Sequence, residues 1–303
     1  MGLDVQAVRF LLTARHRGVS FAKTLCVGRQ ELFIDPGTLQ DLLQSFGLAQ
    51  QEGEARQMLA AATGYAEPLL RRMGAEQITS MDASPYEGAS VVHDLNLPVP
   101  GDLRASYSVV LDAGTLEHVF NFPVALRNCM EMVQQGGHLL LITPANNFMG
   151  HGFYQFSPEL FFRVCTDSNG FEMVRAIVCE VDPAGRWYEV VDPARARRRV
   201  ELVTSKPTYL LIQARRVRQV PVLSDAPQQS DYTALWQASG AETASRPDVA
   251  GRPLTTRVLR GITRRLKAAY RTVEPAGLVA RRTRPDRELF TEVSWMPAPD
   301  TGK

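Results

Sequence analysis

The feature that most constrains the fold is a regular alternation of strand-like and helix-like segments between about residues 20 and 217. The strand-like segments are short apolar runs that end in turn residues, which is the pattern of buried parallel strands. Amphipathic stretches with helix-start and helix-stop residues lie between them. Because parallel strands are joined by crossover helices, this alternation predicts a mostly parallel sheet covered on both faces. We therefore expect an α/β, doubly wound domain.

Seven strands are expected in this sheet. They are the runs TLCVGR (24–29), QITSMDAS (77–84), ASVVHDLN (89–96), YSVVLDAG (107–114), HLLLITPA (138–145), FEMVRAIVCEV (171–181) and TYLLIQARRV (208–217). An arginine-rich excursion over 183–207 separates the last two. Its arginine run, 194–200, either binds an acidic acceptor or is a solvated edge whose charge prevents aggregation.

Composition and charge limit the classes of protein to consider. Of the 303 residues, 45% are hydrophobic and 22% are charged, which is ordinary for a water-exposed globular chain. No apolar run approaches the ~18 residues that span a bilayer. The first 18 residues predict an amphipathic helix and not a signal peptide, because Arg9 interrupts the apolar stretch. The four cysteines lack metal or disulfide spacing, so we expect reduced core cysteines and a cytoplasmic protein.

The chain divides into four expected parts. They are an N-terminal helix (1–19), the α/β domain (20–217), a polar linker (218–256) and a basic helical tail (257–303). Residues 251–303 carry a net charge of +7, against −5 for the rest of the chain. The basic amphipathic stretch 257–271 predicts either peripheral contact with an anionic membrane surface or a helix docked on the domain. No aromatic platform interleaved with basic residues is found, so no nucleic-acid partner is expected.

Acidic residues and a glycine stand where several of the expected strands end. Asp82 ends the second strand, Asp94 the third, and Asp112 with Gly114 the fourth. Ligands of open parallel sheets bind outside the carboxyl ends of the strands, at the point where the strand order reverses. An acid after the second strand can accept hydrogen bonds from ribose hydroxyls, and one after the third can bind an adenine amino group. The sequence therefore indicates a nucleoside site.

Several of these segments resemble those of a known family. The run YSVVLDAGTLEHVFNFPVALRNCMEMVQQGGHLLLITPA is similar to the strand–helix–Gly-Gly–strand core of class I S-adenosylmethionine-dependent methyltransferases. ITSMDAS resembles the second motif of that family, VVHDLN the third, and FYQFSPELFFRVCTDSNGFEMV its later helix and turn. The resemblance covers about residues 20–217. It implies a Rossmann-like, seven-stranded sheet and S-adenosylmethionine as cofactor.

The first motif departs from the family pattern. Where the family has an acid and a G-x-G turn, this chain has CVGRQE, in which only Gly28 matches. The next residue, Arg29, is a long cation that could pair with the carboxylate of the cofactor. The separation of Gly28 and Asp82 is 54 residues, against about 20 in ordinary nucleotide folds.

The resemblance and the strand ends together give a set of expected cofactor-binding residues. They are Gly28, Arg29, Asp82, Ala83, Asp94, Leu95, Asp112 and Gly114. Two of them have plain structural alternatives, since Asp82 could cap the next segment and Asp94 could form an ordinary Asx-turn.

The loop ANNFMGHGFYQFSP (145–158) leaves the fifth strand beside the expected site and is rich in aromatic and hydrogen-bonding residues. It predicts an acceptor pocket, with His151 as general base, because its ordinary pKa lies near neutrality, and Tyr154 as second choice. The alternative is a rigid loop that packs over the sheet. His118 would orient the acceptor or pack under the site. No metal site is expected, because Gly114 stands where metal-binding relatives have an additional acid.

The expected function is transfer of a methyl group from S-adenosylmethionine to an oxygen or nitrogen of a small molecule or glycan. The enzyme would position donor and acceptor for in-line displacement and remove a proton. The alternative is a non-catalytic binding or assembly protein with the methyltransferase fold, associated with a membrane surface through its basic tail. The altered first motif favours this alternative.

Overall fold

The computed structural model describes residues 2–61, 63–238 and 285–297. Its elements are, in chain order, α1 (Val5–His16), β1 (Lys23–Val27), α2 (Pro36–Ser45), α3 (Glu54–Ala61), α4 (Glu67–Arg72), β2 (Gln77–Asp82), β3 (Val91–Val92), η1 (Gly101–Leu103), β4 (Tyr107–Asp112), η2 (Leu116–His118), α5 (Phe122–Met132), β5 (Val133–Asn146), α6 (Pro158–Val164), η3 (Asp167–Asn169), β6 (Phe171–Glu180), β7 (Trp187–Val190), α7 (Pro193–Ala196), β8 (Thr208–Arg216), α8 (Ser230–Ala238) and β9 (Phe290–Val293).

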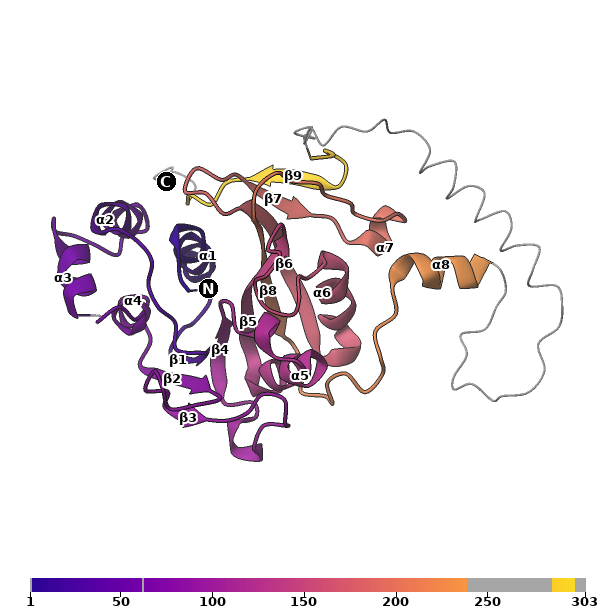
Figure 1. Cartoon of the computed structure of the whole chain (residues 1–303), viewed down its shortest axis with the longest axis horizontal. Coiled ribbons are helices and arrows are strands. Elements are labelled where there is room, and N and C mark those ends of the chain that lie inside the picture. Colours follow the sequence, from indigo (N-terminus) through magenta and orange to yellow (C-terminus); the bar gives the residue numbers. More distant parts are fainter. Residues whose placement is uncertain (1, 62, 239–284, 298–303) are drawn as a thin grey trace, which may run out of the picture.

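Within the described residues, the strands form one sheet in the order β3-β2-β1-β4-β5-β8-β6-β7-β9. Strands β1 to β5 pair in parallel, and β8 runs antiparallel between β5 and β6. At one edge, β7 and β9 add two antiparallel pairs. The expected α/β, doubly wound, mostly parallel sheet is confirmed, with nine strands in place of seven (Figure 1).

Two hydrophobic cores lie on the two faces of the sheet. Because side chains alternate along a strand, Val109 and Leu111 of β4 pack with α1 to α4, whereas Val110 packs with α5 and α6. Every residue of β4 is buried. This explains why the central strands are continuously apolar, as strands covered on both faces are.

The N-terminal helix α1 is part of this packing. Asp4 caps it by accepting a hydrogen bond from the backbone N–H of Ala7, and Phe10 is buried against Trp187 of β7, with ring centroids 6.4 Å apart. Gln6 also accepts a hydrogen bond from Nε1 of Trp187 at 2.8 Å. The first helix of the chain is therefore held against a strand that lies about 180 residues later.

The unusual separation of Gly28 and Asp82 is explained by an insertion. The chain leaves β1, forms α2 and α3, and returns at an antiparallel bridge between Glu31 and Tyr65. The backbone N–H of Ala66 then donates to the carbonyl of Gln30 at 2.9 Å, so α4 begins beside the end of β1. Leaving out the 35 bridged residues, 31–65, shortens the separation from 54 residues to 19. That agrees with the ordinary nucleotide-fold spacing of about 20.

Three segments differ from the sequence-based expectation. Strand β7 lies in the arginine-rich excursion, α8 lies in the expected polar linker, and β9 lies in the expected basic helical tail. The two segments form strands because they pair with other strands. Strand β7 pairs with β6 on one side and, on the other, with β9, which lies about 100 residues later in the chain. The basic stretch 257–271 lies outside the described residues.

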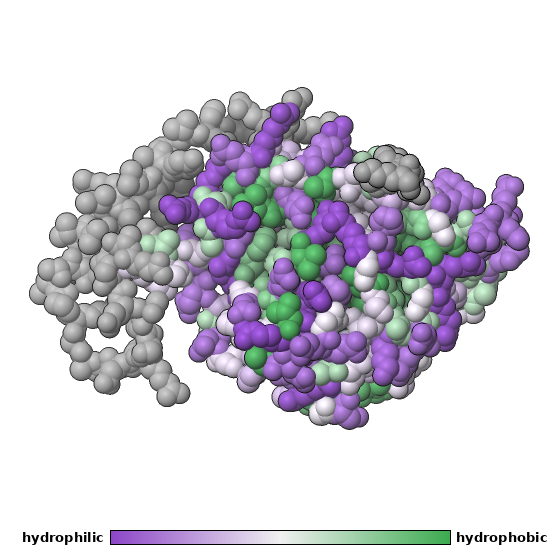
Figure 2. Space-filling view, turned by 180° about the vertical axis from the view of Figure 1, so that it is seen from behind, coloured by the Kyte–Doolittle hydropathy of each residue, from purple (hydrophilic) through white to green (hydrophobic). Residues whose placement is uncertain are grey.

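Hydrophobic and hydrophilic residues are mixed on the face of the molecule opposite to that in Figure 1. Figure 2 shows hydrophobic residues in small separate groups among hydrophilic ones on the face seen from behind. Within the part of the chain that the structure describes, no helix is both long and apolar enough to cross a membrane.

Candidate functional site

The candidate site lies at the carboxyl ends of β1, β4 and β5. The strand order reverses between β1 and β4, since β2 and β3 lie on one side of this pair and β5 on the other. In open α/β sheets this reversal point is where ligands bind. The residues that the sequence analysis selected from the ends of β1, β2, β3 and β4 all lie along this edge.

Gly28 follows β1 in a left-handed conformation, with φ of 75°. Its N–H donates to the carbonyl of Met81 at 2.7 Å, which joins the ends of β1 and β2. The hydroxyl of Thr115 donates to the carbonyl of Val27 at 2.8 Å, and a Cβ on Gly28 would stand 2.5 Å from that hydroxyl oxygen. The close approach that a glycine permits is therefore used by a side chain of the same protein.

Arg29 already has several partners. Its Nε lies 2.7 Å from Oε1 of Glu67, its guanidinium lies 3.8 Å from the ring centroid of Tyr65, and one amino group donates to the carbonyl of Glu87 at 2.8 Å. These contacts join the start of α4 and the end of the insertion to the loop after β2. In this arrangement Arg29 is already paired with a carboxylate of the chain itself.

Asp82 ends β2 as expected and is half-buried, and the following residue, Ala83, is exposed. Oδ1 of Asp82 accepts a long hydrogen bond, 3.4 Å, from the backbone N–H of Ser84. The long distance indicates a weak bond, so the carboxylate keeps most of its capacity to accept hydrogen bonds.

Asp94 is exposed and belongs to a local turn. Its Oδ1 accepts from the backbone N–H and the side-chain amide of Asn96, at 2.9 and 2.7 Å, and the backbone bond above all lowers the pKa of Asp94. The neighbouring Leu95 is buried. This geometry is the Asx-turn that the sequence analysis left open for Asp94.

Asp112 ends β4 and is fully buried. Its Oδ1 accepts from the N–H of Thr115 at 3.0 Å, while its Oδ2 has no hydrogen-bond partner among the described residues. Burial, and then the nearby Glu117, raise the pKa of Asp112 well above its ordinary value. Gly114, with φ of 103°, turns the chain between these two acids.

Glu117 is the site residue that the sequence analysis missed as a functional group. It lies in the 3₁₀-helix η2, and its side chain is 0% exposed. Both of its carboxylate oxygens lack a hydrogen-bond partner among the described residues. Burial raises its pKa to about 7. The run that resembles the methyltransferase core contains LEH (116–118), but nothing in these three letters reveals that the middle residue is buried.

Two imidazoles stand beside this carboxylate. His151 Nε2 lies 3.4 Å from Glu117 Oε1, and His118 Nε2 lies 4.0 Å from the same oxygen. The two rings meet edge to face, with centroids 4.9 Å apart. Burial lowers the pKa of each histidine. The structure thus brings together two of the three residues expected to act on the acceptor.

The loop after β5 is held onto η2 by its backbone. The N–H groups of Phe153 and Tyr154 donate to the carbonyl of Glu117 at 2.7 and 3.3 Å. Gly152, with φ of 72°, lies so close that a Cβ there would stand 2.8 Å from that carbonyl oxygen. The hydroxyl of Tyr154 donates to the carbonyl of Phe120 at 2.7 Å, so this hydroxyl is bound to the protein itself.

Buried polar atoms without partners gather at this edge. Among the described residues, nine buried side-chain polar atoms lack a hydrogen-bond partner, and five of them belong to the site. They are Oε1 of Gln30, Oδ2 of Asp112, both oxygens of Glu117 and Nε2 of His151. Because most buried polar groups in folded proteins are satisfied, such a concentration indicates a place that receives a ligand.

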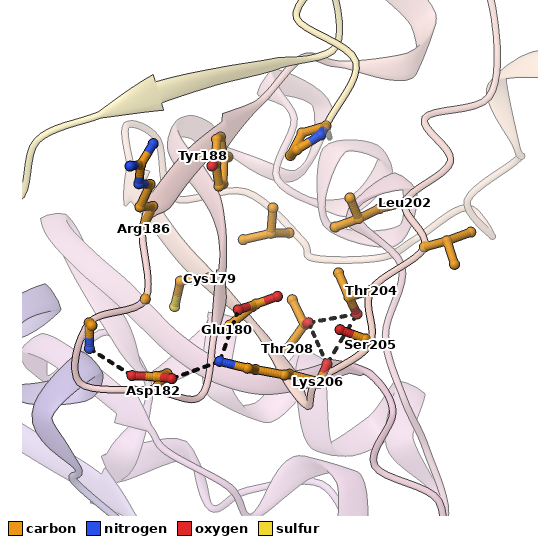
Figure 3. A pocket seen from close by; sticks show the side chains of 15 residues that line it. Cys179, Glu180, Asp182, Arg186, Tyr188, Leu202, Thr204, Ser205, Lys206 and Thr208 are labelled. Carbon is orange, nitrogen blue, oxygen red and sulfur yellow. Dashed lines mark hydrogen bonds and ion pairs between the residues drawn. The ribbon is translucent and has the colours of Figure 1, made fainter. Parts of the chain in front are cut away.

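A separate cavity of about 350 Å³ lies beyond the carboxyl end of β6. Figure 3 shows Lys206 there between Glu180 and Asp182, with Nζ 3.7 and 2.8 Å from their oxygens. The side-chain amide of Asn147, in the loop after β5, donates to the carbonyls of Thr204 and Lys206 at 2.7 and 2.9 Å. The loop that carries His151 is thus tied to the wall of this cavity.

No protein-family model and no curated protein matches the chain. Among solved structures, it is similar to the 1,6-didemethyltoxoflavin-N1-methyltransferase of Burkholderia thailandensis, crystallised with 1,6-didemethyltoxoflavin and S-adenosylhomocysteine. The identity is 12% over 71% of this chain and 79% of that one, with a TM-score of 0.38.

It is also similar to the branched-chain polyamine synthase of Thermus thermophilus, in complex with N4-aminopropylspermidine and 5'-methylthioadenosine. There the identity is 14% over 73% of this chain and 59% of that one, with a TM-score of 0.35. A third similar structure is the cyclase SpnF, at 14% identity over 71% of this chain and 83% of that one, with a TM-score of 0.36. Similarity at this level assigns no ligand or substrate to this chain.

Proposed function

We propose that the protein binds S-adenosylmethionine at the reversal point between β1 and β4 and transfers its methyl group to an oxygen or nitrogen of a small molecule or glycan. The observation that carries the proposal is the half-buried Asp82, which ends β2 at this edge and accepts one long hydrogen bond, 3.4 Å, from the backbone N–H of Ser84. The ribose of a nucleoside would supply further hydrogen-bond donors to this carboxylate.

The two halves of the cofactor fit this edge unequally. Asp82 can accept hydrogen bonds from the ribose hydroxyls, and we propose that the backbone around Asp94 and Leu95, after β3, contacts the adenine. On the amino-acid side, Thr115 stands over Gly28 and Arg29 is paired with Glu67. We infer that binding depends mainly on the nucleoside half.

When bound, the cofactor supplies a methyl group on a sulfonium centre. The contribution of the protein is to hold the acceptor in line with that group and to exclude water. Of the residues predicted to act on the acceptor, His151, in the loop after β5, and His118, in η2, lie side by side with ring centroids 4.9 Å apart. We propose that the acceptor binds over the two imidazoles. The cavity near Lys206 is lined by apolar side chains together with charged and hydroxyl groups, which suits an acceptor with both polar and apolar parts.

Titration calorimetry with S-adenosylmethionine and S-adenosylhomocysteine tests the proposal. We expect binding that Asp82→Ala weakens by roughly 10- to 100-fold, the cost of losing hydrogen bonds to a charged group. Asp102→Ala is the matched control, because this exposed acid precedes β4 at the opposite end of the sheet. The absence of binding at millimolar ligand would overturn the proposal, and would favour the non-catalytic alternative.

A further inference from the structure

We propose that Glu117, His118 and His151 form a binding site for one divalent transition-metal ion. One ligand atom from each of these residues lies within 4.8 Å of the others. The Glu117 oxygen is 3.4 Å from His151 Nε2 and 4.0 Å from His118 Nε2. Ligands about 2.0–2.1 Å from a tetrahedral metal ion are roughly 3.4 Å apart, so small side-chain rotations complete the geometry.

The carboxylate of Glu117 provides an independent reason for an ion. It is fully buried, and both oxygens lack a hydrogen-bond partner among the described residues. A buried acid without partners is destabilising unless a cation or a hydrogen-bond donor compensates it. The atoms nearest to it in the cluster are imidazole nitrogens, which are themselves metal ligands. Nε2 of His151 is likewise buried without a partner.

The ligand types indicate which ions would bind. Two imidazoles and one carboxylate are typical of first-row divalent ions such as Zn²⁺, Fe²⁺ and Co²⁺, whereas Mg²⁺ and Ca²⁺ prefer oxygen ligands. His118 is 46% exposed and His151 is 34% exposed, while Glu117 lies beneath them. An ion would therefore keep open positions on its outer side, where water or an oxygen atom of another molecule could bind.

The backbone holds the three residues in place without an ion. Glu117 and His118 belong to η2, which follows β4, and His151 comes from the loop after β5. That loop is fastened to η2 by the N–H groups of Phe153 and Tyr154, which both donate to the carbonyl of Glu117. The sequence predicted no metal site, because Gly114 stands where metal-binding relatives have an acid. In the structure, His151 supplies a ligand from 34 residues away in the chain.

The experiment uses the full chain, freed of metal with a chelator and titrated with Zn²⁺ or Co²⁺ alone. We expect one ion per chain by calorimetry, visible absorption bands with Co²⁺, and a higher Tm when the ion is present. Glu117→Gln, His118→Ala and His151→Ala should each weaken binding at least tenfold. His16→Gln, which removes an exposed histidine at the end of α1, should leave it unchanged.

Folding of the variants is checked by their Tm without metal. Glu117→Gln should be at least as stable as the wild type in the absence of metal, because it removes a buried carboxyl group without partners. Failure to bind either ion would overturn the proposal, as would binding that all three variants retain. Neither result concerns S-adenosylmethionine, so the metal site and the proposed methyl transfer can fail separately.

Discussion

At the scale of single residues, the site depends on two glycines that other groups approach closely. The hydroxyl of Thr115 fills the space over Gly28, and the carbonyl of Glu117 presses against Gly152. At both glycines, the absence of a Cβ lets another group of the same chain come within contact distance. The first contact closes the amino-acid side of the proposed cofactor site, and the second holds the loop of His151 against Glu117.

Replacement of Arg29 tests whether it binds the cofactor. Because Glu67, Tyr65 and the carbonyl of Glu87 already hold its guanidinium, we expect Arg29→Met to reduce affinity for S-adenosylmethionine less than Asp82→Ala does. Calorimetry on both variants gives the comparison. A larger loss with Arg29→Met would show that this arginine leaves Glu67 to bind the carboxylate of the cofactor.

Replacement of Gly152 tests the contact between the loop and η2. A Cβ at Gly152 would stand 2.8 Å from the carbonyl oxygen of Glu117, so Gly152→Ala should push the loop away and weaken Zn²⁺ binding at least tenfold. Gly150→Ala is the matched control, since Gly150 also has a positive φ but no atom lies within 4 Å of its added Cβ. Equal metal affinity in the two variants would contradict this account.

His138 should make stability depend on pH. Burial, and then Arg215 opposite it on β8, lower the pKa of His138 to about 4, below the ~6.5 of an unfolded chain. The unfolded chain therefore binds a proton that the folded protein excludes, and stability falls as the pH drops below about 6.5. The loss of stability caused by His138 is complete near pH 4, the pKa of this residue in the folded protein.

The measurement is urea unfolding at pH 7 and pH 5. We expect His138→Gln to reduce the loss of stability between these two pH values by about 1–2 kcal/mol. His16→Gln serves as the control, because His16 is exposed. An unchanged pH dependence in His138→Gln would mean that folding does not lower the pKa of this imidazole.

At the scale of elements, the insertion 31–65 and the strand β9 carry the main departures from a simple repeating pattern. The insertion returns to its starting point at the Glu31–Tyr65 bridge, so it adds two helices without changing the order of the strands. Strand β9 extends the sheet from the far end of the chain by pairing with β7.

Strand β9 should contribute to global stability. Phe290 is 3% exposed and belongs to the hydrophobic core on the α5 face, so Phe290→Ala should lower the free energy of unfolding by about 3 kcal/mol. Thr291→Ala, an exposed position on the same strand, should change it by less than about 0.5 kcal/mol. Denaturant unfolding measures both. A small effect of Phe290→Ala would mean that β9 is separable from the sheet.

At the scale of the whole molecule, the central strands could be predicted because each carries its own signal. Runs such as YSVVLD are apolar along their whole length, and local residues such as Ser157 and Pro158 mark where helices begin. The strands β7 and β9 could not be predicted in this way. Each is only four residues long, and the two strands that pair here lie about 100 residues apart in the chain, so tertiary pairing stabilises them.

The site shows the same division. The acids at the ends of β2 and β4 and just after β3 could be read from residue order alone, because that order decides which residue follows each apolar run. Three other features of the site depend on the folded arrangement: Thr115 covers Gly28, Glu67 pairs with Arg29, and Glu117 is buried against His151. Burial and contact depend on which segments meet, and those segments come from different parts of the chain.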